Sequence, residues 1–291
     1  MFLFSLIMSS SHSSPYSKLN NDQTSLITPS APPPGYNTVM DSSKSTKINT
    51  LIEKYEIAYL FSEKLSMLEK YEIVLLIDDS GSMNTPLNDH TAHATRWDEL
   101  KSVINIVISV ATIFDEDGID IHFLNRSNHS NVKSLDEVDT ILHDKPHGLT
   151  PLVSKLEEIL TKFKDSEKPV LVVIPTDGVP NSGNGQDDLK EFKQLLQNKN
   201  HSKFFISFLA CSDQDSEIGY LNDLDKAVPN IDTLDDYCSE RKEVVTVQGA
   251  DFSYTFGDHV ARLLLGPICP ELDNLDERKF KKKRTTRCTI L

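Results

Sequence analysis

Three side chains with oxygen donors follow one apolar run of the sequence. The run 71–77 leads into Asp-Asp-Ser-Gly-Ser, in which Asp78, Ser80 and Ser82 occupy alternating positions. One carboxylate and two hydroxyls suit a hard divalent cation such as Mg²⁺, which takes oxygen ligands and retains several waters. These three donors neutralise such an ion only in part, which leaves room for a further carboxylate. The alternative is an ordinary turn, in which Asp, Ser and Gly make local hydrogen bonds.

The elements that must position this loop alternate along the chain. Short runs rich in β-branched or aromatic residues, typical of buried strands, lie at 73–77, 119–124, 170–174, 204–209 and, more weakly, 244–247. Between them, apolar residues recur at helical spacings of three and four in the segments 97–114, 152–163, 189–196 and 218–224. This alternation predicts a doubly wound α/β domain with a largely parallel sheet and helices on both faces.

Two further loops belong on the same edge of this sheet. In doubly wound folds the ligand loops lie at the carboxyl ends of the strands, where Asp78 is expected. Asp177 follows the buried run 170–175 in the same way, and Thr150 stands just before the helix expected near residue 152. A threonine at a helix start is usually only a cap, and Pro151 beside it supports that role. Its place on the ligand edge nevertheless makes it a candidate ligand.

The three loops, in this order and on this scaffold, resemble the metal-ion-dependent adhesion site of von Willebrand factor type A domains over about residues 70–267. The resemblance implies Mg²⁺ (or Mn²⁺) held by the two serines and, depending on conformational state, by Thr150 or Asp177, with Asp78 acting partly through water. An Asp or Glu of a partner protein would complete the coordination. The implied metal ligands are Asp78, Ser80, Ser82, Thr150 and Asp177.

Two features depart from the family pattern. Asp79 stands where adhesion-type members often carry Gly, and the segment 125–133 leaves little room for the family's antiparallel edge strand. The closer likeness is to intracellular eukaryotic members with Asp-Asp-Ser-Gly-Ser-Met, notably fungal and amoebal ones. Strand alternation turns Asp79 away from Asp78, so we expect it to be solvated or structural. Trp97 is expected to pack, and Arg96 is assigned no function.

The C-terminus predicts a lipid anchor. The last four residues, Cys288 to Leu291, form a prenylation box in which the terminal Leu favours geranylgeranyl. One lipid alone anchors marginally, and a basic run beside it adds attraction to anionic lipid. Such a run stands directly upstream: Arg278, Lys279, Lys281, Lys282, Lys283, Arg284 and Arg287. The alternative is a nuclear-localisation or nucleic-acid patch, which the net charge of −14 on the whole chain disfavours.

The N-terminal residues 1–46 predict a disordered arm. From residue 9 on they are rich in Ser, Pro, Asn and Thr with few aliphatics. Two proline motifs abut in this arm. The first is Pro-Ser-Ala-Pro, the ligand of an ESCRT-I subunit, and the second is Pro-Pro-x-Tyr, the ligand of WW domains such as those of ubiquitin ligases. Their residues are Pro29, Ser30, Ala31, Pro32, Pro33, Pro34 and Tyr36. Proline-rich linkers are common, so each motif alone is weak.

The remaining segments complete the expected organisation. Residues 47–69 predict one helix packed on the domain 70–267, whose last helix lies near 256–263, and residues 268–291 form the basic tail. The segment 1–8 is too short for a signal-peptide core, although Met8 could be the true start, and no run approaches the roughly 18 to 20 apolar residues that span a bilayer. The four cysteines lack metal spacing. These features predict a prenyl-anchored protein on the cytoplasmic face of a membrane, the plasma membrane or an endosome.

Enzyme signatures are not met. A haloacid-dehalogenase phosphatase needs Asp where Ser80 stands, a hydrolase elbow needs Gly-x-Ser-x-Gly, and a phosphate loop Gly-x-x-x-x-Gly-Lys-Ser/Thr does not occur. The candidate bases His122, His143, His147 and His259 do not stand at triad or metal spacing. We therefore expect a membrane-tethered, protein-binding adaptor that is not an enzyme. The alternatives are a Mg²⁺-dependent hydrolase and a copine-like lipid-binding protein, although tandem C2 domains have no room here.

Overall fold

A computed structural model describes residues 42–87, 94–115, 117–212 and 214–280. Its sheet has six strands in the order β3-β2-β1-β4-β5-β6. Every neighbouring pair is parallel except β2 and β3, which are antiparallel. The strands are β1 Glu72–Ile77, β2 Ile119–Phe123, β3 His129–Val132, β4 Val170–Thr176, β5 Phe204–Ala210 and β6 Ile231–Leu234.

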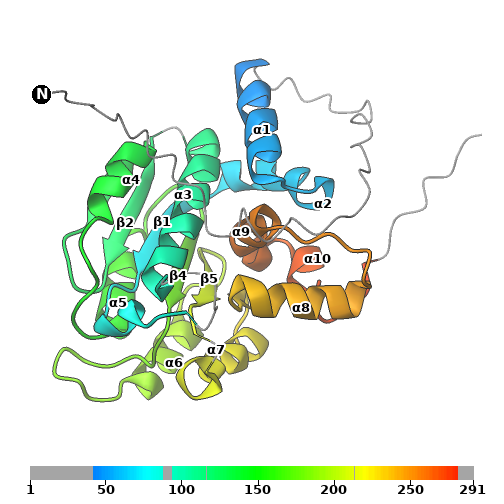
Figure 1. Ribbon diagram of the computed structural model, residues 1–291. Helices are drawn as coiled ribbons and strands as arrows, with labels where there is room; N and C mark the ends of the chain where they lie inside the picture. The colour runs from blue at the N-terminus through cyan, green and yellow to red at the C-terminus, as the bar shows by residue number, and fades with distance from the viewer. Residues whose placement is uncertain (1–41, 88–93, 116, 213, 281–291) are drawn as a thin grey trace, which may run out of the picture.

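Helices cover both faces of this sheet, and the prediction of a doubly wound α/β fold is confirmed (Figure 1). Alternate residues of β1 divide between two apolar cores, with Leu75 in one and Leu76 in the other. The first core is closed by α1 Ser42–Tyr55, α2 Tyr59–Ser62, α3 Arg96–Phe114, α4 Leu135–Ile141, α8 Tyr237–Gln248, α9 Phe256–Leu265 and α10 Pro270–Asp273. The second is closed by α5 Leu152–Lys162, α6 Leu189–Asn198 and α7 Asp215–Ala227.

The prediction of a strand at 244–247 is wrong. These residues belong to α8, whose start is capped by Asp236 through hydrogen bonds from the backbone N–H groups of Cys238 and Ser239. Helical spacing buries only Tyr237, Glu240 and Val244 of α8, so packing on the core overrides the β-branched composition. The last strand of the sheet is instead β6, a run of four residues too short to stand out in the sequence.

The prediction of a single helix at 47–69 is also wrong. The chain forms α1 and α2 and then a 3₁₀ helix, Leu65–Lys70, and the break after α1 has Glu56 at a φ of 54°. A side chain rarely adopts this left-handed backbone, and it ends the α-helix. The apolar positions nevertheless pack on the domain as expected, since Leu51 and Phe61 are both buried.

Both edges of the domain reach further than the sequence indicated. The segment 125–133 does hold an antiparallel edge strand, because β3 needs only four residues to pair with β2. At the other end, the packed region continues past residue 267. Leu272 and Leu275 are buried in the first core, so the chain leaves the domain later than the expected start of the tail.

Two glycines give a matched test of this packing. A Cβ at Gly257 of α9 would overlap the backbone carbonyl of Tyr55, whereas a Cβ at Gly219 of α7 would meet nothing within 4 Å. We expect Gly257→Ala to lower the free energy of unfolding by about 1 to 3 kcal/mol, because backbone cannot yield cheaply. Gly219→Ala should raise it by about 0.5 to 1 kcal/mol through the better helix propensity of Ala. Urea denaturation of both variants measures this, and equal effects would contradict the α1–α9 packing.

Candidate metal centre

The three loops expected to carry ligands meet at the carboxyl edge of the sheet, at the lower side of the view in Figure 1. Backbone hydrogen bonds join them. The N–H of Gly81 donates to the carbonyl of Gly148 at 3.1 Å, and the N–H of Asn181 donates to the carbonyl of Thr150 at 3.0 Å. Asp78 at the end of β1 donates its N–H to Pro175 of β4 at 3.2 Å. The backbone therefore fixes all three loops relative to one another.

The side chains of the first loop contact the third. Ser80 Oγ and Ser82 Oγ lie 3.0 Å apart, and Ser82 Oγ donates to Asp177 Oδ1 at 2.7 Å. The Asp78 carboxylate accepts from the backbone N–H of Ser80 at 2.9 Å and from Thr176 Oγ1 at 2.6 Å. Two carboxylates and two serine hydroxyls thus come together from two loops. Ser82 and Asp177, which are in contact, are 95 residues apart in the sequence.

Thr150 lies beside the Asp177 loop. A Cβ built on Gly178 would be 3.8 Å from Thr150 Oγ1, an ordinary contact distance. Helix α5 begins at Leu152 after Pro151 and has no side-chain cap hydrogen bond, so Thr150 does not serve as its cap. The usual role of a threonine at a helix start is therefore absent. The Thr150 loop is joined to the loop after Asp177 by the hydrogen bonds between Thr150 and Asn181.

The donor set carries buried negative charge. Burial, with a smaller contribution from Asp177, raises the pKa of Asp78 to about 6. Burial also raises the pKa of Asp177, against the opposing effect of hydrogen bonds from Ser82 and Arg96. Both carboxylates are almost fully buried. Oxygen donors of this type, close together and short of positive charge, fit a hard divalent cation.

One cation of the protein already contacts this site. Arg96 Nη1 donates to Asp177 Oδ2 at 2.7 Å, and Nη2 donates to Ser212 Oγ at 2.8 Å and to Glu217 Oε2 at 3.2 Å. This role was not predicted from the sequence. A basic residue in the first turn of a helix opposes the helix dipole, and that is the signal that could have indicated a buried acidic partner. Arg96 leaves Oδ1 of Asp177 on the side of Ser82.

Asp79 points away from these donors. Its carboxylate accepts from Arg126 Nε at 2.7 Å and from the backbone N–H of Asn125 at 2.8 Å. The Arg126 guanidinium in turn lies 5.3 Å from the centre of the Trp97 ring, which is buried in the first core. Asp79 is therefore a buried structural residue that ties the β1 loop to the β2 loop, and Trp97 packs as expected.

The four histidines do not join the site. His143 and His147 are exposed, while His122 and His259 are buried elsewhere. Burial lowers the pKa of His259 to about 3, so its ring is neutral near pH 7. Among the residues that the structure describes, no hydrogen bond joins any of these rings to Asp78 or Asp177.

The remaining predicted residues lie mostly outside the described part of the chain. Arg278 and Lys279 are described, and both are exposed after α10. Lys281, Lys282, Lys283, Arg284, Arg287 and Cys288 fall outside it, as do the motif residues 29–36. Over the ranges that the structure describes, no helix is long and apolar enough to cross a bilayer.

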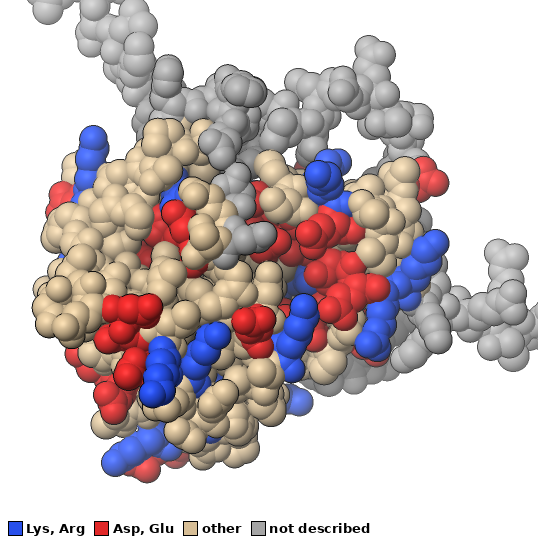
Figure 2. Space-filling model, turned by 90° about the horizontal axis from the view of Figure 1, so that it is seen from below, with Lys and Arg blue, Asp and Glu red and all other residues tan. Residues whose placement is uncertain are grey.

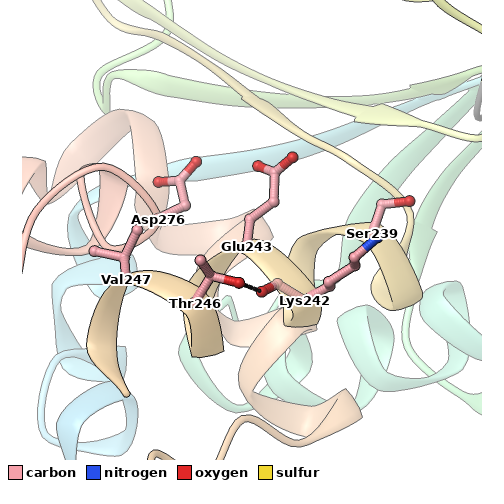
Figure 3. Close-up of a pocket in the computed structure, with 6 residues that line it drawn as sticks. All are labelled: Ser239, Lys242, Glu243, Thr246, Val247 and Asp276. Atoms are coloured by element: carbon pink, nitrogen blue, oxygen red, sulfur yellow. Dashed lines mark hydrogen bonds between the residues drawn. The ribbon is translucent and has the colours of Figure 1, made fainter. Parts of the chain in front are cut away.

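The surface around the site carries mixed charge, and a hollow along α8 lies apart from it. Figure 2, seen from below, faces the carboxyl edge and shows acidic and basic side chains in separate small groups, with no continuous basic face. A hollow of about 360 Å³ lies elsewhere, along α8 (Figure 3). Its lining is Ser239, Lys242, Glu243, Thr246, Val247 and Asp276. None of the predicted metal ligands belongs to it.

No protein-family model matches this sequence, and no curated protein is significantly similar to it. The arrangement of the site residues must therefore support any functional proposal directly.

The Arg96–Asp177 pair gives a test of the site's charge balance. Arg96→Met leaves a buried carboxylate without its cation, so we expect the free energy of unfolding at pH 7, measured by urea denaturation in EDTA, to fall by about 3 to 5 kcal/mol. The control is Lys193→Met, which removes an exposed pair with Asp223 at 3.8 Å. It should change the free energy by no more than about 0.5 kcal/mol. Similar losses in both variants would contradict the assigned role of Arg96.

Proposed function

We propose that this chain is a membrane-tethered adaptor whose α/β domain binds an acidic side chain of a partner protein through Mg²⁺ (or Mn²⁺). The observation that carries the proposal is the contact of Ser82 Oγ with Asp177 Oδ1 at 2.7 Å, which brings two of the three predicted loops together. Thr150 beside Gly178 adds the third loop. This arrangement supports the resemblance to von Willebrand factor type A domains that the loop sequences suggest.

The ligand set assigns each residue a part in holding the ion. The hydroxyls of Ser80, Ser82 and Thr150 would face it, and the carboxylates of Asp78 and Asp177 would balance its charge. When bound, the ion supplies an incompletely coordinated positive centre that a carboxylate from outside can fill. Gly81 and Ser82 are exposed, so a partner can approach the donors from solvent.

In this proposal, the C-terminal end anchors the protein to a membrane and the N-terminal end recruits further partners. Prenylation at Cys288 and the basic run from Arg278 to Arg287 would hold the protein on the cytoplasmic face of a membrane, plasma membrane or endosome. The adjacent proline motifs, Pro29 to Tyr36, would recruit a WW-domain ubiquitin ligase and ESCRT-I. The rival functions are a Mg²⁺-dependent hydrolase, which requires turnover of a phosphoester, and a copine-like lipid-binding protein.

Metal-dependent capture tests the adaptor. The full chain is used as bait in cell extract containing Mg²⁺ or EDTA, as wild type, Asp78→Ala, Ser82→Ala and a control, Ser239→Ala, which removes a hydroxyl of α8 far from the loops in sequence. The ligand should be a protein captured by wild type and Ser239→Ala in Mg²⁺, and lost in EDTA and in both loop variants. Captured proteins that are the same in all four baits and both buffers would refute a metal-bridged adaptor.

Fractionation tests the anchor. Cys288→Ser removes the lipid acceptor, so we expect most of the protein to move from the membrane to the soluble fraction after cell lysis. Cys238→Ser is the matched control, because Cys238 is an exposed thiol of α8. It should leave the distribution unchanged. Equal membrane fractions for wild type and Cys288→Ser would contradict prenyl anchoring.

A further inference from the structure

A second group of acidic side chains lies away from the candidate metal centre. Asp225 of α7, Asp232 of β6 and Asp273 of α10 each offer a carboxylate oxygen, and these three oxygens lie within 4.8 Å of one another. The residues come from three separate elements. They line a cavity of about 180 Å³, which is roomy enough for several waters.

Asp232 has an unusual environment for a carboxylate. It is 1 % exposed, and neither of its oxygens has a hydrogen-bond partner among the described residues. Burying a polar group without a partner costs several kcal/mol, and burying a charge costs more. Burial raises the pKa of Asp232, the Arg262 charge opposes that rise, and the neighbouring Asp273 carboxyl adds to it. Either a proton shared with Asp273 or a bound cation would therefore stabilise this carboxylate.

The backbone makes room for this carboxylate. A Cβ at Gly266 would overlap Asp232 Oδ2, whereas the φ of Gly266 is −49°, a helical value that any residue adopts. Glycine is therefore required at position 266 because the Asp232 carboxylate lies close to its backbone, and not because of an unusual backbone conformation. The side chain of Asp232 is held between the Gly266 turn and the cavity.

The arginine in the cavity acts on Asp232 through its charge, but no hydrogen bond or ion pair joins the two side chains in the described part of the chain. Arg262 is 1 % exposed and ion-pairs with Glu240 and with Asp276 Oδ1, the latter at 2.9 Å. It also donates to the backbone carbonyl of Asp273 at 2.8 Å. The cavity lining holds five acidic residues and only two basic ones, Lys226 and Arg262. The cavity thus keeps an excess of negative charge.

We propose that Asp225, Asp232 and Asp273 form a binding site for Ca²⁺, which ties α7, β6 and α10 together. Ca²⁺ binds oxygens at about 2.3 to 2.6 Å, so two ligands of one ion lie at most about 5 Å apart. The three carboxylate oxygens lie within 4.8 Å of one another and can therefore share one ion. Mg²⁺ is less suited to three protein carboxylates, because it dehydrates reluctantly and usually binds through only one or two of them. Waters in the cavity complete the coordination.

The site has a structural consequence for the C-terminal segment. α10 ends at Asp273, shortly before Arg278 and the basic run, and Asp273 would share the ion with the edge strand β6. Asp276, two residues before Arg278, lines both this cavity and the hollow on α8 (Figure 3). Bound Ca²⁺ would therefore fix the chain where it leaves the domain.

Calcium titration of the full chain tests the site. Protein stripped with EDTA is titrated with CaCl₂ by calorimetry, and thermal unfolding is followed with and without CaCl₂. Wild type should bind Ca²⁺ at this site and unfold at a higher temperature with CaCl₂. Asp273→Asn and Asp225→Asn should each weaken binding at least about tenfold and lose the thermal shift. The control Asp223→Asn changes an exposed carboxylate of α7 and should behave as wild type.

A further variant separates this site from the proposed metal centre. Ser82→Ala removes a donor of that centre and should leave the Ca²⁺-induced thermal shift intact, whatever becomes of partner capture. The competing outcome is a cluster that shares protons, since burial raises the pKa of Asp225 to about 7. In that case wild type shows no calcium response, and Asp232→Asn stabilises the protein at pH 7. That result, or a calcium response unchanged in both Asp225→Asn and Asp273→Asn, overturns the proposal.

Discussion

Buried carboxylates at the end of the central strand constrain how the rest of the domain is built. Asp78 is fully buried where β1 ends between its neighbours β2 and β4, and Asp177 is almost fully buried at the end of β4. Taking such groups out of water is expensive unless hydrogen bonds or positive charge compensate. The side-chain hydroxyls of Thr176 and Ser82, the backbone N–H of Ser80 and the Arg96 guanidinium provide that compensation. This network ties the loop after β1, the end of β4 and the start of α3 to one another.

The same network limits how a metal ion could bind. Arg96 already occupies one oxygen of Asp177, so the protein without metal has an internal cation at the site. A dication close to Ser82 would approach the other oxygen, Oδ1, and would repel the guanidinium. In our proposal, Arg96 therefore supports the carboxylate in the metal-free protein and lowers the affinity for the ion. This balance suits a site that binds metal and partner together more readily than metal alone.

The sequence predicted the parts of the fold that depend on local pattern. The β1, β2, β4 and β5 runs, and the helices α3, α5, α6 and α7, have clear periodicity and lie where expected. The short helix α4 was not predicted. The errors fall where long-range packing decides, as in α8, whose Val244 to Val247 run has β propensity but is helical because Tyr237, Glu240 and Val244 face the core. The position of the three loops followed from the fold, since carboxyl ends of parallel strands share an edge. The Arg96 pairing did not, because it joins residues 81 positions apart with no common motif.

The buried carboxylates Asp177 and Asp232 differ in their contacts with the neighbouring arginine. Arg96 pairs directly with Asp177, whereas Arg262 is held by Glu240, Asp276 and the Asp273 carbonyl. Among the described residues, neither oxygen of Asp232 accepts a hydrogen bond from Arg262. Arg262 lines the same cavity as Asp232, and its charge favours the ionised form of that carboxyl. Because Arg262 is paired with other acidic groups and the lining holds more acidic than basic residues, the cavity keeps an excess of negative charge. A negative cavity that joins three elements is a favourable place for a dication to stabilise the fold, because the free energy of binding then adds to that of folding.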